Sequence, residues 1–255
     1  MTTQPILECR QVSKNFGAVQ ALYKVDFEVV PGEVMALVGD NGAGKSTLIK
    51  GIAGIYPFSE GEIFFAGKPV HIHGPRDAAQ LGIEIVYQDL ALADNLDVVA
   101  NMFLGRERKR SLWRLDESTM EKSAIETLHS LSVTTLRSVR QTVAELSGGQ
   151  RQSIAVAKAV MWNSKVVILD EPTAALGVAQ TRQVLDLVHR LADKGLAVVV
   201  ISHNLHDIFE VADRITVLRL GQRVEVFKTR ETTQQEVVHA ITAGRLLRVP
   251  GMGEL

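Results

Sequence analysis

The stretch VMALVGDNGAGKST, residues 34–47, decides the fold of this chain. Its first six residues form a short, continuous apolar run, which is typical of a strand buried on both faces of a sheet. The pattern G-x-x-x-x-G-K-[ST] begins at Gly39, and the residues from Lys45 to about Ala53 read as a helix. A strand, a glycine-rich loop and a helix in this order predict a phosphate-binding loop.

The residues of this loop have distinct expected roles. The glycines allow backbone N–H groups to turn inward around a β-phosphate. Lys45 supplies a positive charge to the β and γ oxygens, and the hydroxyl of Ser46 can ligate Mg²⁺. The residues predicted to bind the phosphates are Gly39, Asp40, Asn41, Gly42, Ala43, Gly44, Lys45, Ser46 and Thr47.

A second apolar strand, VVILDE at 166–171, ends in two carboxylates. Asp170 emerges at the carboxyl end of the strand, where open α/β sheets bind their ligands. We expect Asp170 to hold Mg²⁺ through water and Glu171 to polarise an attacking water. The chain contains no N-K-x-D motif for reading guanine, so the sequence predicts an ATP site.

Further short apolar runs at 83–88, 196–202 and 214–220 read as core strands that alternate with helical patterns. This alternation predicts an α/β fold, a P-loop NTPase core with a mostly parallel sheet. Residues 6–12 and 20–30 read as antiparallel strands. We expect an N-terminal antiparallel β subdomain at 1–33 and 58–73, core segments at 34–57, 74–88 and 163–243, an inserted helical subdomain at 89–162, and a C-terminal tail at 244–255.

Composition argues against several classes of protein. A formal net charge of −1 disfavours a nucleic-acid binder, which usually carries a basic excess. Cys9 is the only cysteine, so no intrachain disulfide or cysteine cluster for zinc is possible, and a reducing cytosol fits. No secretory signal is visible, and no window approaches the roughly 18–20 apolar residues of a membrane-spanning helix. We therefore expect any work at a membrane to require a partner.

A second glycine pair opens a predicted helix in LSGGQ, residues 146–150. By itself this stretch reads as an N-cap, Ser147, followed by glycines suited to close packing. Taken with Phe16, the phosphate loop, Gln88, VVILDE and His203, it resembles the nucleotide-binding subunit of ATP-binding-cassette transporters. LSGGQ matches that family's signature, the motifs occur in the family's order, and the resemblance covers nearly the whole chain.

The resemblance implies a role for each matched residue. Phe16 would stack on adenine, although it could also be an ordinary half-buried residue at a strand end. Gln88 would touch Mg²⁺ or the attacking water and would open the loop that contacts the membrane partner. His203 would reach the γ-phosphate and support Glu171. The implied catalytic set is Glu171, His203, Gln88 and Lys45, and the implied metal ligands are Ser46, Gln88 and Asp170.

The resemblance also implies that two copies pack head to tail as a homodimer. Each copy's signature, at Ser147, Gly148, Gly149 and Gln150, would complete the ATP site of the other. N–H groups at the start of a helix can stabilise the negative charge of a γ-phosphate. Gly177 departs from the pattern, because the family usually has an Asp there that reaches the partner's phosphate loop. That carboxylate contact is lost, which affects coupling between the two sites but does not exclude hydrolysis.

EPTAALGV at 171–178 and the segment 86–107 look most like cassettes that power bacterial import of monosaccharides, in the ribose, xylose and fructose group. This likeness implies a multi-spanning permease, an extracytoplasmic sugar-binding protein as an indirect partner, no nucleic acid, and a peripheral position on the cytoplasmic face of the inner membrane. The sugar cannot be read from this chain. Two alternatives are a soluble cassette of the translation-factor or DNA-repair type and a regulatory module that binds nucleotide without turnover.

Three weaker features have simple interpretations. RERKR at 106–110 is predicted to be a solvated charge run rather than a site for lipid headgroups or nucleic acid. His71 and His73 lack an apparent third metal ligand and are predicted to lie on a surface strand. Trp113 and Trp162 are predicted to be packing residues.

Overall fold

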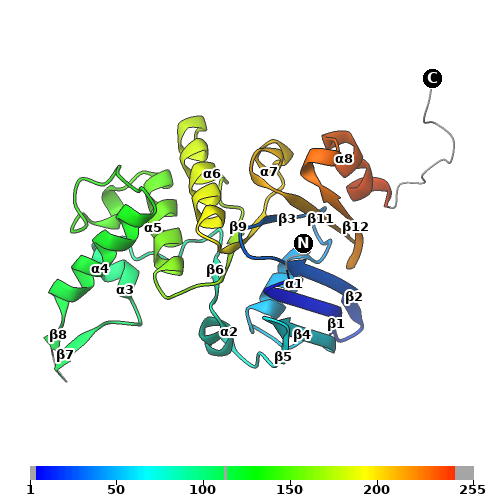
Figure 1. The fold of residues 1–255 in the computed structure, drawn as a ribbon, viewed down its shortest axis with the longest axis horizontal. Coiled ribbons are helices and arrows are strands. Elements are labelled where there is room, and N and C mark those ends of the chain that lie inside the picture. Colours follow the sequence, from blue (N-terminus) through cyan, green and yellow to red (C-terminus); the bar gives the residue numbers. More distant parts are fainter. Residues whose placement is uncertain (1–3, 112–113, 245–255) are drawn as a thin grey trace.

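The computed structural model describes residues 4–111 and 114–244. The predictions for Trp113 and for the tail beyond residue 244 lie outside these ranges. Figure 1 shows a central sheet with an antiparallel sheet below it on the right, and a group of helices at the left end of the molecule.

The central sheet has six strands, listed here in chain order: β3 (Val34–Val38), β6 (Ile83–Val86), β9 (Val166–Asp170), β10 (Ala197–Ile201), β11 (Arg214–Arg219) and β12 (Gln222–Lys228). In space their order is β12-β11-β3-β10-β9-β6. Neighbouring strands from β11 to β6 run parallel, and β12 joins β11 antiparallel at the edge. The predicted α/β fold with a mostly parallel sheet is confirmed.

The antiparallel sheet has the strand order β2-β1-β4-β5. Its strands are β1 (Leu7–Phe16), β2 (Val19–Val29), β4 (Glu60–Phe65) and β5 (Lys68–Val70). One cluster of buried side chains joins this sheet to the first helix and to the central sheet, and it includes Phe27, Met35, Leu48 and Ile52. The phosphate loop therefore enters a helix that is packed between the two sheets.

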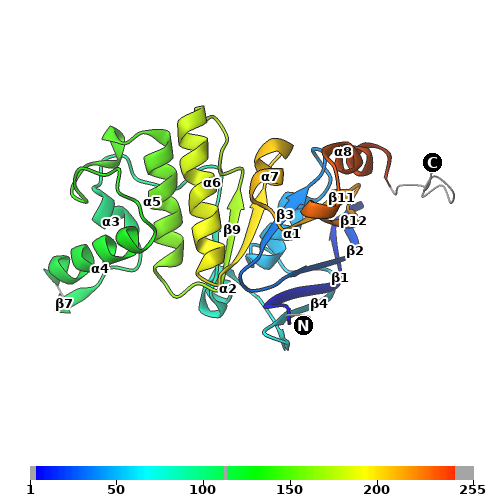
Figure 2. The ribbon, with the colours of Figure 1, turned by 45° about the horizontal axis from the view of Figure 1, so that its top comes forward.

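Most of the other helices lie on the opposite side of the central sheet or extend away from it, whereas the helices at 45–52 and 75–81 pack on the side that faces the antiparallel sheet (Figure 2). The helices are α1 (Lys45–Ile52), α2 (Pro75–Leu81), α3 (Val98–Phe103), α4 (Glu117–Ser130), α5 (Gly148–Val160), α6 (Val178–Asp193), α7 (Leu205–Val211) and α8 (Gln234–Ala243), with 3-10 turns at Val143–Glu145 and Thr229–Glu231. A small hairpin of β7 (Lys109–Ser111) and β8 (Arg114–Leu115) precedes α4. None of the helices in the described ranges is both long and apolar enough to cross a membrane.

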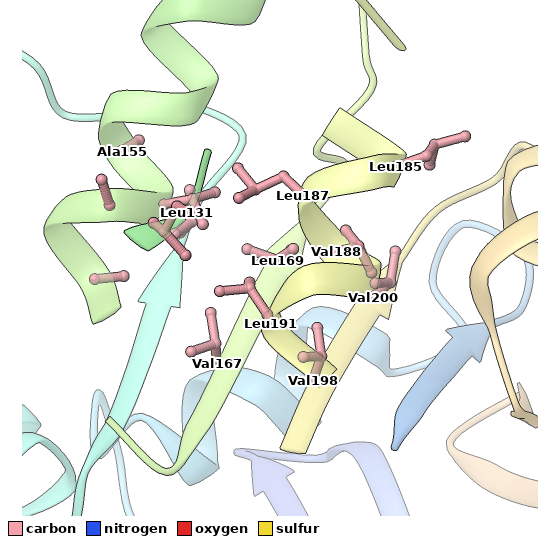
Figure 3. Close-up of a cluster of buried hydrophobic side chains, with 14 of the residues drawn as sticks. Leu131, Ala155, Val167, Leu169, Leu185, Leu187, Val188, Leu191, Val198 and Val200 are labelled. Atoms are coloured by element: carbon pink, nitrogen blue, oxygen red, sulfur yellow. The ribbon is translucent and has the colours of Figure 1, made fainter. Parts of the chain in front are cut away.

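Helix α6 shows how the sequence pattern produces the core. Its apolar stripe at Val184, Leu185, Val188 and Leu191 is fully buried. Figure 3 shows this helix lying over β9 and β10, whose alternate residues point toward it. Burying one such side chain contributes about 1.5–3 kcal/mol, so the stripe fixes α6 on the sheet. Gly195, just after the helix, has a left-handed φ of 84°, a conformation that commonly follows the end of a helix.

Three local predictions from the sequence were wrong. Strand β1 continues to Phe16 instead of ending near residue 12, because its polar end pairs with β2. Strand β6 ends at Val86, where its pairing with β9 ends, so Tyr87 and Gln88 lie beyond the strand. His71 and His73 follow β5 rather than lying in a strand. The β7–β8 hairpin was not foreseen, because its short polar strands lack apolar alternation.

Candidate nucleotide-binding site

The phosphate loop follows a strand that is buried along its entire length. Gly39 has φ 151° and Gly44 has φ 101°, values that L-amino acids rarely adopt. A Cβ at Gly39 would lie 2.2 Å from the carbonyl oxygen of Leu218, and one at Gly44 would lie 2.7 Å from Cδ2 of Leu22. Both glycines are therefore required by close packing against neighbouring strands as well as by backbone conformation.

The side chain of Lys45 is held in place by hydrogen bonds to backbone carbonyls at the start of the phosphate loop. Its Nζ donates to the carbonyl oxygen of Gly39 at 2.5 Å and to that of Asp40 at 3.1 Å. Burial lowers the pKa of the Lys45 ammonium, and the nearby carboxylates of Glu171 and Asp40 oppose this shift. The side chain is thus a fixed cation beside the loop, as the motif predicts.

A cavity of about 300 Å³ lies beside the loop, and carboxylate and amide side chains from other elements line it. Burial raises the pKa of Asp170 above its ordinary value, and the adjacent carboxylate of Glu171 adds to the increase. A cation in this cavity would stabilise the charged carboxylate of Asp170 against both its burial and the negative charge of Glu171. The residues lining the cavity are Ala21, Asn41, Gly42, Ala43, Gly44, Lys45, Ser46, Thr47, Gln88, Asp170, Glu171 and Ile201.

The structure therefore brings together most of the site residues predicted from the sequence. Gln88 reaches the cavity from the segment after β6, and Ser46 reaches it from the first turn of α1. A hydroxyl, a carboxylate and an amide oxygen are the kinds of ligand that Mg²⁺ prefers, so the donor set fits this ion. Ala21 and Ile201 also line the cavity, although no sequence motif pointed to them.

Glu171 and His203 form a direct pair at the edge of the cavity. Nδ1 of His203 lies 2.8 Å from Oε2 of Glu171. Glu171 has the unusual backbone φ of 50°, and its N–H donates to the carbonyl oxygen of Ile201 at 2.8 Å. Strained non-glycine residues gather at functional sites, where the surrounding structure holds them in place. The two side chains named in the predicted catalytic set are therefore in contact, while the supporting role of His203 stays a prediction.

The signature stretch lies outside this cavity. Ser147 caps α5 in a capping box: its Oγ accepts from the N–H of Gln150, and its own N–H donates to Oε1 of Gln150 at 2.9 Å. The amide Nε2 of Gln150 also donates to the carbonyl oxygen of Thr135 at 2.7 Å. Ser147 and Gly148 are exposed. Within one chain, the signature and the phosphate loop are thus not brought into a single site.

The loop that joins Glu171 to α6 packs against the signature. A Cβ at Gly148 would lie 2.9 Å from Cδ2 of Leu176, and one at Gly149 would lie 3.1 Å from Cβ of Gln180. The two signature glycines therefore allow α5 to approach the start of α6. Gly177 begins α6 without a side-chain cap and in open space, and the next residue, Val178, is 91% exposed.

Two of the weaker features meet in the structure, because one end of the charge run at 106–110 packs against a tryptophan. Arg106 pairs with Glu84 at 2.8 Å and lies over the ring of Trp162, which also packs edge to face on Phe103. Trp162 is therefore a packing residue.

A glycine-rich loop between a buried strand and a helix, facing a carboxylate pair at the carboxyl edge of a parallel sheet, defines a P-loop nucleotide-binding cassette. The family model for ABC transporters matches residues 22–174 of the chain. The chain belongs to this family.

Individual relatives extend over nearly the full chain. The chain is 48% identical to the fructose import ATP-binding protein FrcA of Rhizobium meliloti, with 96% of each chain covered. It is 46% identical to the xylose/arabinose import ATP-binding protein XylG of Sulfolobus acidocaldarius, with 98% of each covered. Among solved structures, a nucleotide-free ATP-binding cassette from an ABC transporter superposes with a TM-score of 0.81 at 26% identity, covering 94% of this chain and 96% of that one. A dimeric post-hydrolysis cassette bound to ADP and phosphate superposes with a TM-score of 0.73 at 25% identity, covering 89% and 100%.

Proposed function

We propose that this chain is the ATP-hydrolysing subunit of an importer that takes up a monosaccharide through a separate membrane permease. The observation that carries the proposal is the match, over nearly the full length of both chains, to two proteins named for import of fructose and of xylose or arabinose. The cavity beside the phosphate loop supplies the chemistry that such a subunit needs.

ATP binds with its phosphates on residues 39–47 and its base on Phe16, which is 47% exposed at the end of β1. Lys45 neutralises the β and γ oxygens. Ser46, Asp170 and Gln88 would hold Mg²⁺, directly or through water. When bound, the ion neutralises charge that develops on the phosphates.

Hydrolysis depends on the pair of Glu171 and His203. Glu171 orients and polarises the attacking water, and His203 fixes the Glu171 carboxylate through the 2.8 Å contact. The left-handed backbone at Glu171 aims this carboxylate at the cavity that it lines. The exposed His203 can also reach the γ-phosphate, as the family resemblance implies.

A second copy of the chain completes the site. Residues 147–150 start α5 with a side chain and N–H groups suited to a phosphate anion, yet they lie outside their own chain's cavity. Head-to-tail packing of two copies would bring the signature of each onto the ATP of the other. A relative by structure has been solved as a dimer with ADP and phosphate, which supports this arrangement.

The proposed role in transport requires the dimer to lie on the cytoplasmic face of the inner membrane, in contact with the permease. Binding of ATP closes the two copies and hydrolysis reopens them, and this motion is passed to the permease. An extracytoplasmic sugar-binding protein delivers the sugar, so the partners of this chain are proteins and ATP rather than nucleic acid.

Co-purification from membranes tests the proposal. The tagged chain should recover a multi-spanning permease, and one monosaccharide with its binding protein should stimulate ATP hydrolysis of the reconstituted complex. A Glu171→Gln variant serves as the control, because it should recover the same permease without turnover. Recovery of ribosomes or DNA-repair proteins in place of a permease would overturn the proposal.

A further inference from the structure

The ring of Phe16 is held by a second aromatic residue from a distant segment. Tyr56, which follows α1, meets Phe16 edge to face, with ring centroids 5.1 Å apart and an interplanar angle of 89°. This geometry is a favoured one for aromatic pairs. Phe16 still exposes 47% of its surface, so the contact leaves part of the ring free to receive a flat ligand.

Lys14 joins the two rings. Its Nζ lies 4.8 Å from the centroid of the Tyr56 ring and 5.2 Å from that of Phe16. The same ammonium donates to the carbonyl oxygen of Pro57 at 2.7 Å. A cation within about 6 Å of a ring centroid is attracted to the ring, so Lys14 ties β1 to the segment after α1.

Tyr56 also contacts the phosphate loop. Its hydroxyl donates to the carbonyl oxygen of Thr47 at 3.2 Å. Burial raises the pKa of Tyr56, so the phenol keeps its proton and remains a donor at neutral pH. One side chain therefore contacts both the ring assigned to the base and the loop assigned to the phosphates.

We propose that Tyr56 and Lys14 are positioning residues that fix the Phe16 ring as a preformed platform for the nucleotide base, at a set distance from the phosphate loop. This inference rests on the proposed ATP site. Without the two contacts, Phe16 would have to be ordered when the base binds, because it lies at the end of a hairpin. A preformed platform removes that cost and favours a nucleoside triphosphate over bare tripolyphosphate.

Calorimetric titration of the full-length chain with ATP and with tripolyphosphate, each with Mg²⁺, tests this role. Phe16→Ala should weaken ATP binding about tenfold, because base stacking is lost. Tyr56→Leu and Lys14→Met should each weaken it about threefold to fivefold, and Tyr56→Phe about twofold, as expected for a loss of ordering rather than of contact. Affinity for tripolyphosphate should stay unchanged in every variant.

Tyr23 offers a matched control. It is a partly exposed tyrosine on β2, and Nζ of Lys24 lies 5.6 Å from its ring centroid, but its ring does not pair with that of Phe16. Tyr23→Leu should leave both affinities unchanged. The conservative Tyr56→Phe variant keeps the test decisive if Tyr56→Leu does not fold.

The outcomes separate this inference from the proposed function. If Phe16→Ala weakens ATP binding and the Tyr56 and Lys14 variants do not, the positioning role is overturned and the ATP site stands. A parallel loss of tripolyphosphate affinity in the Tyr56 variants would also overturn it, since Tyr56 would then act on the phosphate loop alone. Failure of the unmodified chain to bind ATP would overturn the proposed function itself.

Discussion

Two regions of this molecule have glycines at the start of a helix. They differ in how many ligand-binding groups each gathers within one chain. In the phosphate region, Lys45, Asp170 and Glu171 line one cavity, and His203 contacts Glu171. The signature region, residues 146–150, is capped by its own side chains and does not line that cavity. The difference is the one expected from the proposed head-to-tail dimer, in which the first region binds ATP within one chain and the second contributes to the ATP site of the other copy.

The largest effect should come from removing the carboxylate of the phosphate region that acts on the attacking water. Glu171→Gln removes the carboxylate that polarises water and should lower turnover by more than about 100-fold. ATP binding should persist, so the variant should accumulate as an ATP-bound dimer on gel filtration. Glu62→Gln, on the exposed face of β4, is the control and should behave as the unmodified chain. Normal turnover in Glu171→Gln would contradict the assigned role.

A charge placed in the signature region should have the next largest effect. Ser147→Arg fills the helix start with a bulky side chain and should lower turnover about 100-fold while the monomer still binds ATP. Thr233→Arg is matched to it, because Thr233 forms the same kind of capping box at α8. Both variants should lose a similar amount of thermal stability. Equal turnover in the two would argue against a shared site.

Removal of the histidine contact should have a smaller effect. His203→Ala leaves the Glu171 carboxylate without its 2.8 Å partner and should lower kcat roughly tenfold by misplacing the water. The Kd for ATP should change little, because the phosphate loop is intact. A steady-state assay beside a binding titration separates these quantities, and a changed Kd with constant kcat would refute the expectation.

Gly177 should give the smallest effect. Gly177→Asp supplies a side-chain cap to α6 in open space and should raise the free energy of unfolding by a few tenths of a kcal/mol. It should also raise the Hill coefficient for ATP hydrolysis, since it restores a carboxylate at the proposed interface. Gly177→Ala is the control for bulk alone. If Gly177→Asp changes neither rate nor cooperativity, the position has no part in coupling.

The sequence predicted contiguous motifs better than contacts between segments. The phosphate loop and VVILDE were recognisable because neighbouring residues define them, and both line the cavity. The pairing of Glu171 with His203 followed only from the family resemblance, since no local pattern encodes a contact across 32 positions. Tyr56 carried no signal, because its position beside Phe16 depends on how the end of β1 meets the segment that follows α1.

Strand β3 illustrates a consequence for the order of synthesis. It pairs with β10 on one side and β11 on the other, and both strands come from the C-terminal third of the chain. A ribosome that has not yet released residue 219 therefore carries a phosphate loop on a strand that lacks one or both partners. Distant pairings of this kind are slow to form, so the nascent chain exposes the apolar β3 for most of its translation. Nucleotide binding should accordingly arise only after residue 219 has left the ribosome, which makes ATP a late ligand for this part of the emerging protein.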